Sequence, residues 1–169
     1  EDYMHDNIKK KINIAAKRQP ADLVIKNCKI VNVFTHEIIE GDIAISDGKI
    51  AAVGNYSGEK EVDAEGRYAL PGFINSHIHI ESSFVSPEEF SRLVVPHGTT
   101  TIIADPHEIV NVCGMDGFDY MVKAGKNAAL DIKYMIPSCV PCTPWEHAGA
   151  VVDSKAISEV INQDKVFGM

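Results

Sequence analysis

The sequence predicts an α/β protein in which a small all-β unit precedes the first βα units of a parallel sheet. Short β-patterned runs fill residues 22–67. After residue 70, apolar strand-like runs begin near Phe73, Thr101, Ile132 and Val166. These intervals of about thirty residues match the length of one βα unit. We therefore divide the chain into residues 1–70 and 71–169.

The first twenty residues have the pattern of a short basic amphipathic helix, which we expect to end before Pro20. The runs LVIKNCKIVNVF, IIEGDIAIS and KIAAVG follow and are typical of strands. Asp47-Gly48 lies between the last two runs and predicts a tight hairpin, because both turn residues tolerate positive φ. Residues 1–70 are therefore expected to form a helix followed by a small all-β unit.

The helices of the βα units differ in how clearly the sequence marks them. The first has Ser86 as N-cap, Pro87 at the first helical position, Glu89 to complete a capping box, and Gly98 beyond its end. A second helix is predicted from Gly117 to Ala129. A third is predicted from Asp153 as N-cap to about Gln163.

Three complete βα units and the start of a fourth strand fit within residues 71–169. A closed βα barrel needs eight strands and usually about 250 residues. The chain is therefore interpreted as a fragment, with an open sheet edge and an apolar face that favour self-association or pairing with a missing segment.

Charge and composition exclude several classes of partner. The formal net charge of -8 argues against nucleic acid, because the phosphate backbone attracts basic surfaces. No apolar run reaches the roughly eighteen residues of a membrane helix, so we expect a cytoplasmic protein with no membrane partner. Cys139-Val-Pro-Cys142 has the spacing of a redox or zinc motif, but Pro141 and Pro144 disfavour the helix that a thioredoxin-like site requires.

His77 and His79 are the first candidate site residues. Side chains two positions apart on a strand leave the same face about 7 Å apart, so both imidazoles can bind one divalent cation. The apolar neighbours Phe73, Ile74, Ile78 and Ile80 are expected to pack against covering layers, which would leave the histidines in an enclosed, water-poor centre. The alternative is a pair of ordinary core or surface histidines.

Further polar residues follow the first two strands. Glu81 lies two positions after His79 and would therefore share the strand face of His77 and His79. The second strand is followed by Asp105, His107 and Glu108. Carboxyl ends of parallel strands carry the active sites of βα barrels, and a cation would explain so many carboxylates in one place. Alternatively, Asp105 is a helix cap or turn former and Glu108 a solvated charge in a first helical turn.

Three stretches carry a resemblance to a known family. PGFINSHIHIESS, PHGTTTIIADPHEIVNVCG and PSCVPCTPWEHAGA are similar to the amino-terminal part of the adenine deaminase family in the amidohydrolase superfamily. The PGFIN-x-HIH pattern is typical of the superfamily, whereas ESS and GTTTIIADPHE distinguish adenine deaminases from dihydroorotases and imidazolone hydrolases. The runs KNCKIVNV and GDIAISDGKIAAVG also resemble the small β-sandwich that amidohydrolases build from both ends of their sequence.

The resemblance implies a metal-dependent (β/α)8 TIM-like barrel, incomplete in this chain, beside a β-sandwich portion in residues 1–70. It implies one or two divalent ions, manganese, iron or zinc, with His77 and His79 as ligands. The other ligands and the catalytic base are expected beyond residue 169. The residues expected to line the pocket, orient the ligands or hold an extra ion are Glu81, Asp105, His107 and Glu108.

The reaction implied for the complete enzyme is hydrolytic deamination of adenine to hypoxanthine and ammonia, a step of purine salvage, by a homo-oligomer whose partner is a purine base. This chain by itself is expected to be inactive. Two alternatives stay open: another amidohydrolase such as a cyclic amidase, and a non-catalytic metal-binding or assembly fragment.

Overall fold

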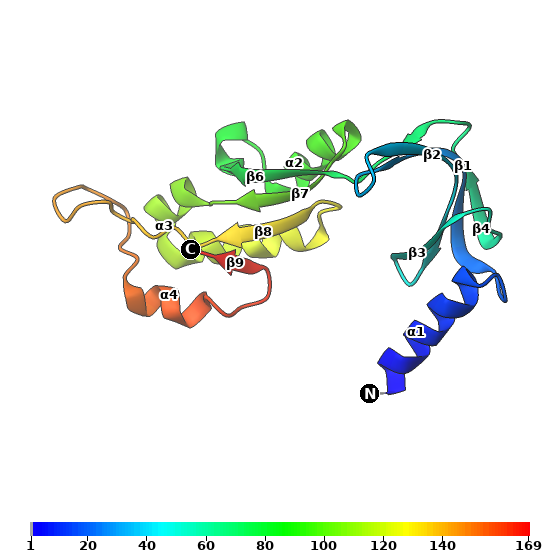
Figure 1. Cartoon of the computed structure of the whole chain (residues 1–169). Coiled ribbons are helices and arrows are strands. Elements are labelled where there is room, and N and C mark those ends of the chain that lie inside the picture. Colours follow the sequence, from blue (N-terminus) through cyan, green and yellow to red (C-terminus); the bar gives the residue numbers. More distant parts are fainter. Residues whose placement is uncertain (1) are drawn as a thin grey trace. The chain divides into compact units, whose positions relative to one another are not determined.

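The computed structural model describes residues 2–169 and divides the chain into two compact units, with the boundary between Pro71 and Gly72. Glu1, the first residue of the predicted N-terminal helix segment, lies outside the described residues. Figure 1 labels the elements of both units. In the described part of the chain, no helix has the length and apolar content needed to cross a bilayer.

The first unit consists of helix α1 (Asp2–Ala15) and a five-stranded mixed sheet. Its strands are β1 (Ala21–Asn32), β2 (Glu37–Ser46), β3 (Lys49–Gly54), β4 (Gly58–Asp63) and β5 (Tyr68–Ala69). β1 lies antiparallel to β2 and parallel to β4 and β5, and β3 pairs with β2. The predicted sandwich stays a prediction, because these strands belong to one sheet.

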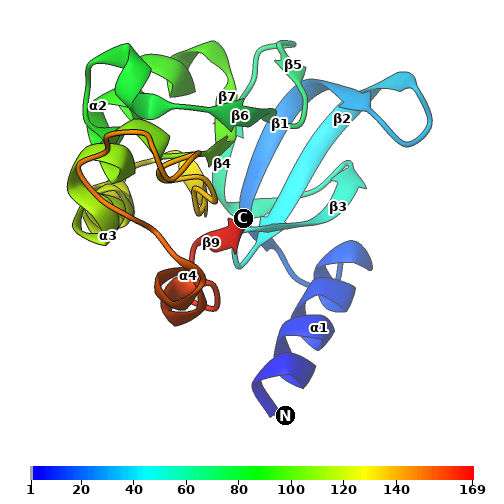
Figure 2. The ribbon, with the colours of Figure 1, turned by 90° about the vertical axis from the view of Figure 1, so that its left-hand side faces the viewer.

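The N-terminal helix and the hairpin predicted in this unit are confirmed. Helix α1 ends before Pro20 and lies close to β3 (Figure 2). Its Ile14 side chain is fully buried in a cluster with residues of β1 and β2. Asp47 and Gly48 have φ values of 50° and 71°, and they join β2 to β3 in an antiparallel pair. The side chain of Lys10 contacts both Asp22 and Asp47, so an ion-pair cluster also ties α1 to the hairpin turn.

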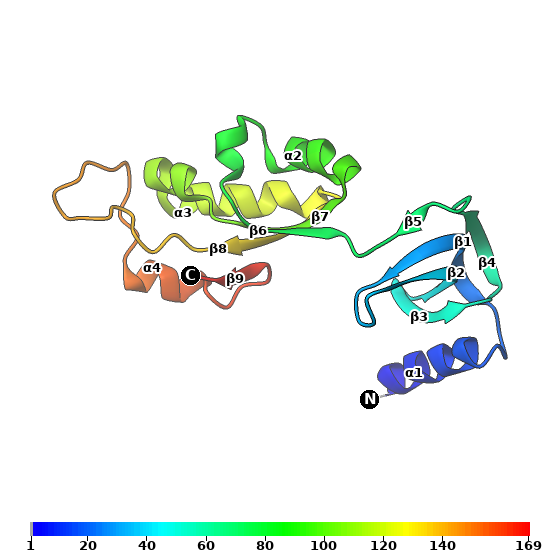
Figure 3. The same ribbon diagram turned by 45° about the horizontal axis from the view of Figure 1, so that its top comes forward.

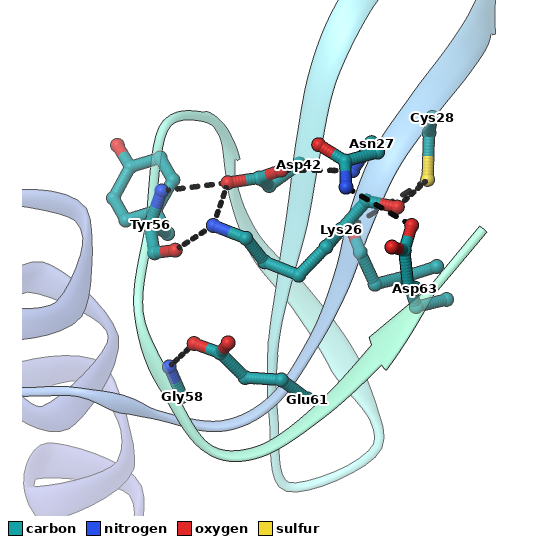
Figure 4. A network of polar contacts seen from close by, with 9 residues as sticks. Lys26, Asn27, Cys28, Asp42, Tyr56, Gly58, Glu61 and Asp63 are labelled. Atoms are coloured by element: carbon teal, nitrogen blue, oxygen red, sulfur yellow. Dashed lines mark hydrogen bonds and ion pairs between the residues drawn. The ribbon is translucent and has the colours of Figure 1, made fainter. Parts of the chain in front are cut away.

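A partly buried ion pair links Lys26 in β1 to Asp42 in β2, in the middle of this sheet (Figure 4). The Asp42 carboxylate accepts hydrogen bonds from Lys26 Nζ at 2.6 Å and from the backbone N–H groups of Asn27 and Tyr56 at 3.1 Å each. The N–H of Asn27 lies in the register shift between Ile25 and Cys28. Burial raises the pKa of Asp42, but Lys26 and the two N–H groups outweigh that effect and hold this pKa below its usual value.

The second unit is a four-stranded parallel sheet in the order β6-β7-β8-β9, which confirms the predicted alternation of strand and helix. Its strands are β6 (Phe73–Ile78), β7 (Thr99–Ala104), β8 (Asp131–Met135) and β9 (Val166–Gly168), and its helices are α2 (Pro87–Val94), α3 (His107–Ala124) and α4 (Ser154–Val160). Short 3-10 segments cover Ile80–Ser83, Val95–His97 and Gly125–Asn127. The helices flank the strands (Figure 3), and all three contribute side chains to one core around Ile102 and Ile132.

The predicted helix starts were right for α2 and α4 and wrong for α3. Ser86 Oγ accepts the Glu89 N–H at 3.4 Å, but the Glu89 carboxylate binds Arg92, so the reciprocal half of the capping box is not formed. Asp153 caps α4, which ends at Val160, earlier than predicted. Helix α3 begins at His107 rather than at Gly117.

The misplaced start of α3 has a local cause. Gly114 interrupts the helix with φ 63° and ψ -146°, a backbone conformation that favours glycine. The helix predicted from the sequence starts at Gly117, after this interruption. In the structure Gly114 and Gly117 lie inside a kinked helix. Both positions are closely packed, because a Cβ at Gly114 would meet Ala150 at 3.0 Å and one at Gly117 would meet the Ile109 carbonyl at 2.8 Å.

The expectation that every apolar residue around the histidines is covered was wrong. Ile80 is fully buried, but Phe73 and Ile74 are 56% and 66% exposed. β6 is an edge strand of the sheet that the described residues form, so it has a neighbour on one side only. The first strand of the unit therefore presents part of its apolar surface to solvent.

Candidate metal centre

Three imidazoles gather at the edge of the sheet where β6 and β7 end. His77 lies in β6, His79 is the first residue after it, and His107 is the first residue of α3. The ring centroids of His77 and His79 are 5.0 Å apart, and those of His79 and His107 are 6.3 Å apart. The two parallel strands end together because the Asp105 N–H donates to the Ile78 carbonyl at 2.9 Å.

The surroundings of these histidines are more open than the sequence suggested. His77 is exposed, and the side chain of His79 is 30% exposed. The predicted water-poor centre is therefore not formed by the described residues. The physical reason is again the edge position of β6, which leaves one flank of the strand without a neighbour.

Glu108 contacts the ring of His79. Its Oε2 lies 2.9 Å from Nδ1 of His79, so this carboxylate is not simply a solvated charge. A carboxylate oxygen accepts hydrogen bonds, so this contact calls for a hydrogen on Nδ1, and in a neutral ring Nε2 then keeps its lone pair. Carboxylates orient metal-binding histidines in this way.

Glu81 does not continue the strand as predicted, because the strand ends at Ile78 and residues 80–83 form a 3-10 turn. Its Oε1 accepts the backbone N–H of Ile109 at 3.2 Å, and its Oε2 is buried without a hydrogen-bond partner among the described atoms. Burial raises the pKa of Glu81, and the bond from Ile109 opposes only part of this shift.

Asp105 lies between β7 and α3 and is not the cap of α3. The N-cap is Pro106, which makes no side-chain capping bond. One carboxylate oxygen of Asp105, Oδ1, is buried and has no hydrogen-bond partner within the described residues. The alternative interpretation of Asp105 as a helix cap is therefore wrong.

The donor set suits a divalent cation in part. Two imidazoles leave one strand end, and the segments after β6 and β7 hold two buried carboxylate oxygens, Glu81 Oε2 and Asp105 Oδ1, that lack hydrogen-bond partners among the described residues. Within the described part of the chain, however, no group of three or more His, Cys, Asp or Glu side chains could hold a metal ion. These residues therefore fit a metal as part of a ligand set and not as a closed site.

Cys139 and Cys142, which have the spacing of a redox or zinc motif, are free thiols.

The contribution of the first turn of α3 was missed from the sequence, since the helix was expected to begin at Gly117. A signal was present. Pro106 followed by Glu108 is the usual start of a helix, with proline near the first position and an acidic residue in the first turn. This signal would have placed Glu108 and the Ile109 N–H at the carboxyl edge of the sheet.

In βα barrels the active site lies at the carboxyl edge of the parallel strands, and the imidazoles and carboxylates of this chain lie at that edge. The model of the amidohydrolase family matches residues 68–166. The chain belongs to the amidohydrolase family, as the resemblance implied.

Two relatives share most of this chain. It is 62% identical over 162 residues to "Adenine deaminase 2" of Desulfotalea psychrophila, a match that covers 96% of this chain and 28% of the relative. It is 54% identical over 166 residues to "Adenine deaminase" of Geobacillus kaustophilus, covering 98% of this chain and 29% of the relative. The chain therefore spans under a third of the length of these relatives.

Two solved structures share the fold. The D-hydantoinase of Thermus sp. matches with a TM-score of 0.53 and 24% identity, over 67% of this chain and 27% of that one. The N-acyl-D-glutamate deacylase of Bordetella bronchiseptica, complexed with zinc and a phosphonate inhibitor, matches with a TM-score of 0.51 and 19% identity, over 70% of this chain and 30% of that one. At these identities the similarity shows the fold alone.

Proposed function

We propose that the chain is part of an enzyme that hydrolyses adenine to hypoxanthine and ammonia, and that it supplies His77 and His79 as ligands of a divalent metal ion. The observation that carries this proposal is the extensive identity to relatives named adenine deaminase, which includes the segment with both histidines. Further ligands, and the residues that complete the barrel, come from outside residues 2–169. The ion is manganese, iron or zinc, and zinc is present in one structure of the same fold.

The residues of this chain have separate parts in the proposed reaction. A bound divalent cation supplies the activation of water for attack on the ring carbon that carries the amino group. His77 and His79 hold the ion, and Glu108 fixes the ring of His79. Glu81, Asp105 and His107 follow β6 and β7 at the same edge of the sheet, where their side chains can accept or donate hydrogen bonds to a purine base.

The test uses the full-length protein that the gene encodes, loaded with manganese, iron or zinc. Ammonia release is measured with adenine and, in parallel, hydrolysis of dihydroorotate. We expect deamination of adenine alone, lost by at least about a hundredfold in His77→Asn and His79→Asn because each removes a ligand. The control is His97→Asn, an exposed histidine at the amino end of β7. Ring hydrolysis of dihydroorotate without ammonia release, or full activity of both ligand variants, would refute the proposal.

A further inference from the structure

Three contacts join the end of β6 and the segment after it to the start of α3. The Asp105 N–H donates to the Ile78 carbonyl at 2.9 Å, and the Ile109 N–H donates to Glu81 Oε1 at 3.2 Å. His79 Nδ1 lies 2.9 Å from Glu108 Oε2. All three link residues 78–81 to residues 105–109. The two segments therefore share one set of hydrogen bonds at the carboxyl edge of the sheet.

Helix α3 lacks a cap of its own. A helix leaves its first N–H groups without intrahelical partners, and the residue before the first turn usually supplies an acceptor side chain. Pro106 has no such side chain, and it makes no capping bond. Glu81 supplies the acceptor instead, from a position 28 residues earlier in the sequence. Its negative charge also suits the positive end of the helix dipole.

The helix turn that Glu81 caps also carries Glu108. Because Ile109 is the next residue, the bond to Glu81 holds the Glu108 backbone in the first turn of α3, from which its carboxylate contacts His79. An acceptor on Nδ1 selects the tautomer of His79 in which Nε2 has no hydrogen. Only that nitrogen can then bind a cation.

We propose that Glu81 and Glu108 form a positioning clasp, in which Glu81 fixes the first turn of α3 and Glu108 thereby holds His79 as the Nδ1–H tautomer. Neither carboxylate needs to touch the ion or the substrate. The use of His79 as a ligand rests on the proposed function, whereas the clasp and the tautomer are properties of the metal-free chain.

The tautomer is read directly from the ¹⁵N shifts of the two ring nitrogens of His79, at about pH 9, well above the ordinary imidazole pKa of about 6.5. We expect the Nδ1–H form in the wild type and a mixture of both forms in Glu108→Ala. Glu81→Leu is expected to give the same mixture although it leaves Glu108 in place. Glu81→Gln keeps an acceptor for the Ile109 N–H and is expected to restore the Nδ1–H form.

The cap is read from amide hydrogen exchange of Ile109. Glu81→Leu should raise its exchange rate about tenfold, the usual effect of removing a helix cap, and Glu81→Gln should leave it near the wild-type rate. Glu88→Gln is the matched control, because Glu88 occupies the same position in the first turn of α2 as Glu108 does in α3. This control should change neither the tautomer nor the exchange rate. Far-UV circular dichroism confirms that each variant is folded.

Titration of Mn²⁺ into the same chain separates the clasp from the proposed function. If the wild type binds Mn²⁺ through His79, Glu108→Ala should weaken binding about 10- to 100-fold. No Mn²⁺ binding in any variant would count against the metal role and leave the tautomer result to decide the clasp. The clasp is overturned if wild-type His79 is the Nε2–H form, or if Glu81→Leu speeds exchange at Ile109 while the tautomer stays unchanged.

Discussion

Replacing Asp42 by asparagine should destabilise the first unit by about 2–3 kcal/mol. Asp42 Oδ2 accepts from Lys26 and Tyr56, and Oδ1 accepts from Asn27. The asparagine carbonyl can replace Oδ2 as a neutral acceptor, which costs about 1 kcal/mol of charge assistance. Its amide group then faces the N–H of Asn27 and leaves that donor unpaired, which costs about 1–2 kcal/mol more.

The loss of folding stability in Asp42→Asn should decrease as the pH falls. The pKa of Asp42 is lower in the folded protein than in the unfolded chain. The stabilisation is therefore fully present above the ordinary aspartate pKa of about 3.9 and is lost as pH falls through the lower folded value. The difference between wild type and Asp42→Asn should be largest near neutral pH and should narrow in acid.

The assay must report the first unit by itself, since the two units need not unfold together. Urea denaturation is followed by pulsed hydrogen exchange and mass spectrometry of peptides from β1 and β2, at neutral pH and in acid. Glu65→Gln is the control, because Glu65 belongs to an exposed ion pair with Arg67 and should cost under about 0.5 kcal/mol. The reasoning fails if Asp42→Asn costs no more than this control, or if its cost does not shrink in acid.

Three further substitutions test the packing and the turns with the same method. Ile80→Ala should cost the second unit about 2–5 kcal/mol, because Ile80 is fully buried in its core, and peptides of β7 should show the loss. Tyr134→Phe should cost about 1–2 kcal/mol, since the hydroxyl donates to the buried Met121 carbonyl at 2.7 Å; an unchanged midpoint in urea would contradict this. Gly48→Ala should cost about 1 kcal/mol in β2 and β3 from backbone strain alone, because φ is 71° and no atom lies within 4 Å of the added Cβ; equal stability would show that the turn relaxes.

Elements with local sequence signals were predicted correctly. The Asp47-Gly48 turn, the Ser86 cap and the Asp153 cap depend on residues within three positions of each other, and the structure confirms each of them. The order of the parallel sheet also follows from the sequence, because each βα unit places its strand beside the preceding one. The motifs around His77 and His79 likewise predict the amidohydrolase family, to which the chain belongs.

The contacts of the polar residues at the sheet edge depend on long-range packing and could not be predicted from local patterns. The alternation of side chains along a strand predicted that Glu81 shares a face with the histidines. The strand instead ends at Ile78, and Glu81 bonds the first turn of a helix, 28 residues later in the sequence. The partner of His79 is separated from it by 29 residues. Hydrogen bonds over such separations depend on where two strands end relative to one another, and that relation is set by pairing across the sheet and not by any local pattern of residues.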